Sequence, residues 1–406
     1  FPQSAFCAMQ KSLQMEWQFV QRVTKCPPDS FAPVEAALAD TFLSALFQCT
    51  PPSRDLTSLP VKFAGLSLPD PTKTAKSNFS ASSSLISDLS NSLRGICSFD
   101  LLSHQKTIRE ATKWNKEASQ TTHEMQLQAH LQHHPPSLQR TLKRSAQTSN
   151  WLTICPTTAS QTTLSASEFH DSLYMRYGLD LLNLPPVCDG CGAPFSTNHA
   201  LQCKTGGLVI LRHNEVRDEL AALCAAAFTP SAIRNEPLIE LPLPQPPTTA
   251  APPGTSDTST PPGVPGPTVV NVPSGDRGDL LVRSFYTNSM DCIFDIRIQD
   301  LDAPSYLTQD PEKCLIASEN EKKRKYQQKC HEQRRTFVPF VVSVDGLLAP
   351  EAINSLKQIA RKLSDKWQRP YSAIFGYVKS RIGISVIRGA QLCLRGSRVH
   401  VTAMSN

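Results

Sequence analysis

Three cysteines and one histidine lie within sixteen residues of this chain, and their spacing constrains the local fold more than any other feature. Cys188, Cys191, His199 and Cys203 follow the pattern C-x2-C-x7-H-x3-C. A C-x2-C turn presents two thiolates to one ion, and the last two residues are spaced by about one helical turn. Four such ligands complete a tetrahedral zinc shell, so the pattern predicts a structural zinc site. The alternative is chance clustering of small core cysteines.

The remaining cysteines indicate the compartment. The chain has 406 residues and thirteen cysteines, and those outside the cluster are dispersed. An odd, scattered count argues against a disulfide framework and indicates a reducing, intracellular setting. We expect two or three domains from the length. We expect no signal peptide, no apolar run long enough to cross a membrane and no membrane partner. The first residue is Phe1, which favours a fragment or a processed product.

Charge is distributed unevenly along the chain. From residue 321 to 406 there are 17 Lys and Arg against 5 Asp and Glu, a net charge of +12, whereas the whole chain carries +6. The first 320 residues therefore carry −6. A basic C-terminal segment indicates a polyanionic partner, most often nucleic acid. The alternative is an ordinary solvated charged surface.

Proline marks a long insert in the second half of the chain. Eleven of the 33 prolines lie between Pro242 and Pro273. This composition cannot bury a core, so the segment 242–275 is predicted to be a disordered insert. Strand-like segments flank it, which places it inside one domain. From Gly206 onward the predicted order is helix, strand, loop, strand, strand, helix, strand and helix, an α/β arrangement with a mixed sheet covered by helices.

Two acidic residues are predicted to face each other after the insert. A hairpin turn at 287–289 would place Asp279 opposite residues near Ile296. Strand alternation then brings Asp279, Asp295 and Arg297 to one face. Two adjacent carboxylates repel each other in an apolar sheet, but they suit Mg²⁺. The alternative is an edge hairpin with ordinary surface acids.

A basic run follows at Lys322 to Tyr326. It reads most simply as a solvated helix face. Lys322 and Tyr326 are four residues apart and would share one side of that helix. A lysine beside two metal-binding acids can stabilise negative charge that develops on a phosphate in the transition state.

The order of these motifs resembles the C-terminal region of non-LTR retrotransposon proteins that carry a restriction-like endonuclease of the PD-(D/E)xK superfamily. The layout is a C-C-H-C knuckle, Arg-His-Asn, a Glu-Pro strand, two strands with one Asp each, and Lys-x-x-Lys-Tyr. The resemblance implies an α+β or α/β multi-domain protein with a mixed-sheet nuclease domain flanked by helices. Its parts would be a thumb-like helical remnant of a reverse transcriptase at 1–75, a helical linker at 76–183, the zinc knuckle at 184–205 and the nuclease at 206–406.

The resemblance also implies two sets of functional residues. The catalytic set comprises Asp279 and Asp295 as Mg²⁺ ligands, together with Glu236 and Lys322. The nucleic-acid-binding set comprises Arg212, His213, Lys323, Lys325 and Tyr326. The sequence departs from the family pattern in having Gly278 where Pro is frequent, Arg297 where many members have Lys, Asn214 where relatives often have Asp, and a long insert between the acids.

The function implied by the resemblance is Mg²⁺-dependent nicking of a double-stranded DNA target in the nucleus, as a step of target-primed reverse transcription. Element RNA would be a second partner. The sequence contains no Tyr-x-Asp-Asp motif, so no polymerase activity is expected. The alternative is a non-catalytic remnant that binds nucleic acid. A third interpretation, a structural zinc-containing host protein, is disfavoured by the basic C-terminal segment.

Overall fold

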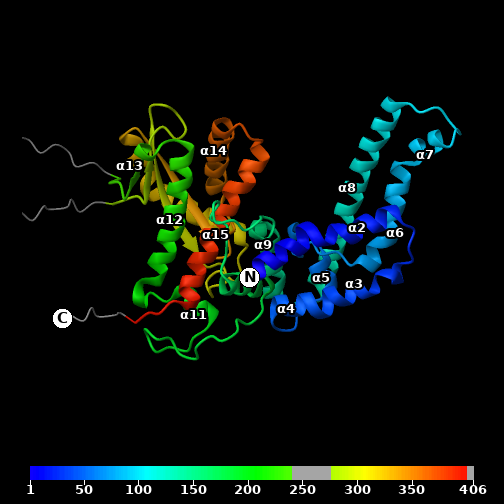
Figure 1. Ribbon diagram of the computed structural model, residues 1–406. Helices are drawn as coiled ribbons and strands as arrows, with labels where there is room; N and C mark the ends of the chain where they lie inside the picture. Colours follow the sequence, from blue (N-terminus) through cyan, green and yellow to red (C-terminus); the bar gives the residue numbers. More distant parts are fainter. Residues whose placement is uncertain (240–275, 400–406) are drawn as a thin grey trace, which may run out of the picture.

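The protein is described by a computed structural model that covers residues 1–239 and 276–399. Helices make up the N-terminal half, and a small sheet with its own helices forms most of the C-terminal half (Figure 1). The predicted insert 242–275 lies outside the described residues. Its two flanks meet, since the Ile239 amide donates to the Asp276 carbonyl over 2.9 Å. Residues on the two sides of the insert are therefore neighbours in the fold.

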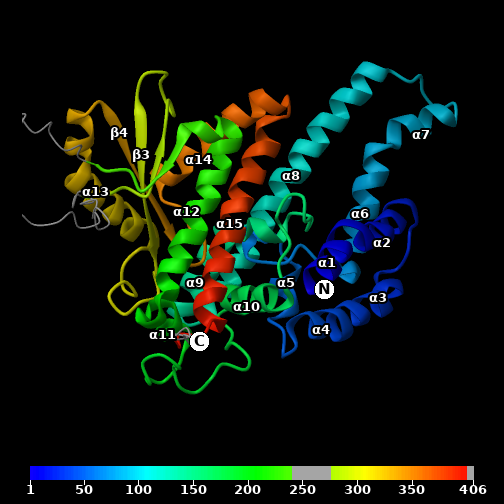
Figure 2. The same ribbon diagram turned by 60° about the vertical axis from the view of Figure 1, so that its left-hand side comes forward.

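The N-terminal part is helical throughout. Its helices are α1 (Pro2–Ala8), α2 (Gln14–Val23), α3 (Ala32–Ala36), α4 (Ser44–Phe47), α5 (Arg54–Ser58), α6 (Pro71–Leu85), α7 (Ser87–Leu93), α8 (Leu101–Gln132), α9 (Pro136–Thr148) and α10 (Ala166–Tyr177). Short π-helical turns at Met9–Leu13 and Ala37–Leu43 join neighbouring helices. Helices α6, α7 and α8 form an arm that projects from the body in both ribbon views (Figures 1 and 2).

Local sequence signals fix α10. The Ser165 hydroxyl accepts a hydrogen bond from the Glu168 amide, and the Glu168 carboxylate accepts one from the Ser165 amide. This reciprocal capping box satisfies two amides that have no partner within the helix. Gly178 ends the helix in the left-handed conformation (φ 62°). The residue types at both ends, a Ser-x-x-Glu start and a glycine after the last turn, are those that commonly begin and end helices.

One expectation about apolar runs was wrong. Among the described residues, the helical stretch Pro28–Phe47 is long and apolar enough to cross a membrane by length and composition. Core helices can meet the same criterion. This stretch places Leu38, Leu43 and Phe47 in fully buried positions. Two of them, Leu43 and Phe47, pack in the core of the N-terminal helices.

The C-terminal half contains the mixed sheet. Its elements are α11 (Thr197–Gln202), α12 (Leu208–Ala227), β1 (Ile233–Asn235), β2 (Leu280–Val282), β3 (Asp291–Gln299), α13 (Pro311–Glu332), β4 (Arg335–Ser343), α14 (Pro350–Trp367) and α15 (Tyr371–Arg395). The strand order is β1-β2-β3-β4, with two antiparallel pairs followed by the parallel pair β3–β4. From α12 to α14, the sequence of helices and strands is the one predicted.

The two faces of the sheet bury different helices. Cys292, Phe294 and Ile296 of β3 pack with α12, α14 and α15. Ile293, between them in the chain, packs with Tyr326 of α13 on the other face. This alternation follows from the two-residue period of a strand. It also assigns Asp295 and Arg297 to the α13 face, where Lys322 and Glu321 lie within ion-pairing distance of them.

The helical part and the sheet part share a continuous core. Ala200, Ile384 and Leu394 belong to the same buried cluster as the N-terminal helices. In Figure 2, α12 and α15 run side by side between the sheet and these helices. The predicted boundaries at 183/184 and 205/206 are therefore crossed by packing contacts.

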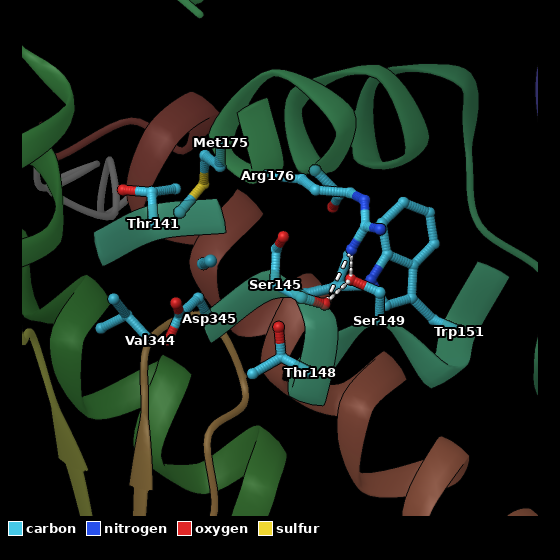
Figure 3. A pocket seen from close by; sticks show the side chains of 12 residues that line it. Thr141, Ser145, Thr148, Ser149, Trp151, Met175, Arg176, Val344 and Asp345 are labelled. Carbon is cyan, nitrogen blue, oxygen red and sulfur yellow. Dashed lines mark hydrogen bonds between the residues drawn. The ribbon is translucent and has the colours of Figure 1, made fainter. Parts of the chain in front are cut away.

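Two polar features lie at this junction. Arg144 of α9 is buried and pairs with Asp302 and Asp345, which follow β3 and β4. Nearby, a cavity of about 40 Å³ is lined by Ser145, Ser149 and the buried Arg176 (Figure 3). Arg176 donates to the carbonyls of Ser145 and Gly65, both at 2.8 Å. That volume suits a few water molecules, so the cavity reads as a hydrated joint between the two parts.

Candidate metal centre and acidic site

The four predicted zinc ligands converge. The side-chain ligand atoms of Cys188, Cys191, His199 and Cys203 all lie within 4.8 Å of one another. The Cys203 sulfur is 4.0 Å from that of Cys188 and 3.9 Å from that of Cys191, and Cys191 Sγ is 3.4 Å from His199 Nε2. Tetrahedral zinc with bonds of about 2.3 Å to sulfur and 2.0 Å to nitrogen requires separations of about 3.8 and 3.5 Å. The donor set and its spacing fit one zinc ion.

Local backbone bonds hold the ligands in this arrangement. The Cys188 amide donates to the Ala193 carbonyl (2.8 Å), and the Gly192 amide donates to the Cys188 carbonyl (3.0 Å). Gly192 adopts φ 74°, a conformation that residues with a Cβ rarely take. Ser196 then caps α11 by accepting from the His199 amide. The turn and the short helix are therefore set by residues within the cluster itself.

The thiol chemistry also suits a metal. Desolvation disfavours the Cys188 thiolate, but hydrogen bonds from the backbone amides of Cys191 and Gly190 outweigh it. The pKa of Cys188 falls to about 6. A thiol that ionises readily is a ready metal ligand, because the metal binds the thiolate.

Sequence reasoning missed the residues that attach this knuckle to the rest of the protein. Asp189 accepts hydrogen bonds from the Ser397 hydroxyl and the Arg398 amide, both at 2.8 Å. The Arg398 side chain is buried; it donates to the Ala200 carbonyl at 3.1 Å and lies 5.1 Å from the Phe195 ring centroid. About two hundred residues separate the two partners in the chain, and no motif relates them.

The predicted acidic pair is also brought together. Strands β2 and β3 pair so that Leu280 faces Phe294 and Val282 faces Cys292. Asp279 lies in a bend just before β2, and its amide donates to the carbonyl of Phe294, the residue that precedes Asp295. The centre of the intervening loop falls at Thr287, one residue before the centre of the predicted turn at 287–289.

Gly278 explains one departure from the family pattern. A Cβ at this position would lie 2.4 Å from the Ile293 side chain, which is closer than any contact that Cβ atoms make. The Gly278 amide also donates to the Pro237 carbonyl (2.9 Å). A proline here would clash and would remove that hydrogen bond.

Asp295 is the buried member of the pair. Its side chain is 9% exposed, and Lys322 Nζ lies 2.8 Å from Oδ2. This close ion pair places the ammonium group of Lys322 directly against the buried Oδ2. Burial raises the pKa of Asp295, Lys322 partly offsets the rise, and the charge of Asp279 adds to it. A buried carboxylate needs a cation beside it, and Lys322 supplies that charge in this structure.

Helix α12 supplies the other side of the site. His213 Nε2 lies 3.3 Å from Asp279 Oδ2, an oxygen that also accepts from the Ile296 amide at 2.5 Å. Burial lowers the pKa of His213, but the hydrogen bond and charge of Asp279 raise it overall. One turn further along, Arg217 lies 3.5 Å from Glu236. Glu236 is mainly exposed and follows β1.

Three residues predicted to contact nucleic acid have other roles. Arg212 is buried and donates to the Leu201 carbonyl (2.9 Å), so this structure does not present it to a phosphate. Tyr326 is also buried, and it packs against Phe337 beneath α13. His213 is half-buried against Asp279. Helix periodicity alone did not show which side of each helix faces the core.

The lysines of the basic run differ in their partners. Lys323 forms an ion pair with Glu351 at the start of α14. Lys325 is exposed; it lies 4.7 Å from the Tyr326 ring centroid and 3.9 Å from Asp276. Lys322 alone among them reaches Asp295. The run is therefore divided between the acidic site, the α14 helix and solvent.

Within residues 1–239 and 276–399, one group of three or more Cys, His, Asp or Glu side chains has ligand atoms that all lie within 4.8 Å of one another. That group is the Cys188 cluster. The acidic residues around Asp295 do not form such a group. They offer a paired site of two carboxylates, flanked by the cations Lys322 and His213. Neither a protein-family model nor a curated protein matches this chain.

Proposed function

We propose that this chain is a metal-dependent DNA endonuclease with a structural zinc knuckle, of the kind carried by non-LTR retrotransposon proteins. Its reaction is phosphodiester hydrolysis, its substrate is a double-stranded DNA target in the nucleus, and element RNA is a second partner. Asp279 and Asp295 are the proposed Mg²⁺ ligands.

The observation that supports this proposal best is the closeness of two carboxylates: Asp279, just before β2, accepts a hydrogen bond from the Ile296 amide, which is next in the chain to the buried Asp295 of β3. Ionised carboxylates at adjacent strand positions destabilise a fold unless a cation offsets their repulsion. Burial is the main cause of the raised pKa of Asp295, and the charge of Asp279 adds to it. Lys322 Nζ lies 2.8 Å from Oδ2 of Asp295, so a metal ion bound here would share that oxygen with the ammonium group or displace it.

The chain's own residues have separate roles in the proposed reaction. A magnesium ion, when bound, supplies Lewis-acid polarisation of the phosphate. Lys322 places a positive charge beside Asp295, where it can stabilise an additional negative charge on the phosphate. His213 holds one oxygen of Asp279 from the opposite side and so fixes the orientation of that carboxylate. Glu236 faces solvent next to Arg217 and assists from the rim of the site.

A second function, nucleic-acid binding without hydrolysis, is favoured by one observation. Lys322 and His213 already offset the charges of Asp295 and Asp279, and no third ligand residue of the described part completes a metal site there. In a protein that has lost catalysis, Lys322 and His213 would take the place of the metal ion and neutralise the two carboxylates.

Nicking of a supercoiled plasmid distinguishes the two functions. The proposed nuclease converts supercoiled to open-circular DNA with Mg²⁺, and Asp279→Ala abolishes conversion while DNA affinity is retained. Glu312→Ala, an exposed acid at the start of α13, serves as the matched control. Wild-type protein that binds DNA but never nicks it in Mg²⁺ or Mn²⁺ supports the binding function instead.

A further inference from the structure

The turn between α14 and α15 exposes cations and aromatic rings together. We call the α14–α15 patch the set Arg361, Lys362, Trp367, Arg369 and Tyr371, all of which are exposed. Trp367 is 40% and Tyr371 is 38% exposed, high values for such large side chains. From residue 357 to 371 there are five Lys and Arg against one Asp. No residue of this patch was assigned a role by sequence motifs.

The patch cations are unpaired. Among the described residues, no carboxylate lies within ion-pairing distance of Arg361, Lys362 or Arg369. This contrasts with Lys322 and Lys323, each of which has an acidic partner. Cations gathered without counter-charges repel one another, and a polyanion relieves that repulsion.

The aromatic rings are held in fixed orientations. Tyr371 stacks on Phe375 with an interplanar angle of 7° and a centroid separation of 5.9 Å. Trp367 packs edge-to-face on Tyr377 at 5.8 Å. Exposed rings that are fixed from below offer their free surfaces for stacking at a small entropic cost.

The turn is also anchored to the sheet domain. Lys366 Nζ donates to the Ala226 carbonyl over 2.8 Å at the end of α12, and Gln358 donates to the Phe285 carbonyl over 3.1 Å. His213 lies thirteen residues before Ala226 on the same helix, which is about 20 Å at 1.5 Å per residue. A strand with about 3.4 Å per nucleotide covers that distance in roughly six nucleotides.

We propose that the α14–α15 patch binds a single-stranded segment of nucleic acid about six nucleotides from the acidic pair. Unpaired cations track phosphates, and exposed rings stack on bases that are free of pairing. A duplex hides its base faces, so it would use the cations and leave Trp367 and Tyr371 without a role. The position of the patch relative to the acidic pair rests on the proposed nuclease function. Binding of nucleic acid by the patch depends only on its own charges and rings.

The test measures binding of the full chain to a 20-nucleotide single strand and to the matching duplex in Mg²⁺-free buffer, by fluorescence anisotropy at several salt concentrations. The variant Arg361→Gln/Lys362→Gln/Arg369→Gln should weaken single-strand binding and lower the salt slope by about 2, at roughly 0.7 per phosphate contact. Tyr371→Ala should weaken single-strand binding by about tenfold, whereas Tyr371→Phe should not, because the ring remains.

The control is Arg109→Gln/Lys113→Gln/Lys116→Gln, which removes the same charge from the exposed surface of α8. Equal losses in the control and the patch variant would overturn the proposal, because they would indicate a general charge effect. Equal losses for single strand and duplex would overturn the single-strand assignment. If the protein does not hydrolyse DNA but still binds single strands through the patch, the proposed nuclease activity is contradicted. The proposal that the patch binds single strands is then still supported.

Discussion

Removing one knuckle ligand should release one metal ion and detach a distant segment without unfolding the protein. The change is Cys191→Ser. Three pairs of ligand atoms in the knuckle are in close contact, at separations of 3.4 to 4.0 Å. In a regular tetrahedron these edges place the centre about 2.1 to 2.4 Å from each ligand, the range of zinc bonds to nitrogen and sulfur. Wild-type protein should therefore contain about one zinc per chain, and Cys191→Ser should contain little.

The effect on stability should be local. Structural zinc contributes about 10–16 kcal/mol in small zinc-finger peptides that have no other core. Here the knuckle contributes Ala200 to the core of the N-terminal helices, and only Leu184 and Phe195 of the segment 184–205 pack against that core from its edge. Metal loss should therefore open the knuckle and shift the main thermal transition by only a few degrees. Because Asp189 holds Ser397 and Arg398, the C-terminal segment should become accessible at the same time.

Three measurements check this reasoning. Metal analysis gives the zinc content, Co²⁺ substitution gives the absorption of a tetrahedral thiolate site, and limited proteolysis reports cleavage near residue 397. Cys97→Ser, an exposed cysteine outside the knuckle, is the matched control. A wild-type protein without zinc, or a Cys191→Ser protein that retains a full equivalent, would refute the tetrahedral site. Global unfolding on metal loss would refute the claim that the knuckle is energetically separate.

The remaining predictions concern the acidic site and the attachment of the knuckle. Asp295→Asn should abolish Mg²⁺-dependent nicking yet raise the thermal midpoint in metal-free buffer, because burial raises the pKa of this carboxyl and its charge costs stability at neutral pH; a lower midpoint in calorimetry would contradict this. His213→Ala should raise the Mg²⁺ concentration for half-maximal nicking by about 10- to 100-fold, and His213→Asn by less, because the residue orients a proposed ligand; an unchanged requirement would assign His213 elsewhere. Arg398→Ala should raise proteolysis near the knuckle while the zinc content stays near one; loss of zinc would show that Arg398 is needed for the metal itself. The zinc affinity of metal-free protein, measured with a chromogenic chelator, should fall more steeply with decreasing pH below about 6, because Cys188, with a pKa of about 6 in the metal-free fold, must then lose a proton to bind the metal; an equal pH slope above and below pH 6 would contradict this.

Features that depend on neighbouring residues were predictable from the sequence. The knuckle ligands lie within sixteen residues, and local turns and one helix cap bring them together. The capping residues of α10 fix its ends. The approach of Asp279 to β3 follows to within one residue from the predicted turn at 287–289, because strand pairing on both sides of a hairpin is counted from its centre. The element order from α12 to α14 followed from alternating hydrophobic patterns.

Only the tertiary structure decided which polar side chains face solvent. Arg212 and Tyr326 belong to motifs that predict contact with nucleic acid, yet each is buried against a partner on a different element eleven residues away, the Leu201 carbonyl for Arg212 and the Phe337 ring for Tyr326. The pairing of Asp189 with Arg398, and the gathering of unpaired cations between α14 and α15, also depend on long-range packing. The periodicity of apolar residues in the sequence predicts that a helix has a polar side and an apolar side. The orientation of a charged residue near their boundary is set by which neighbours the fold brings to it, because a buried charge is tolerated only where carbonyls or counter-charges meet it.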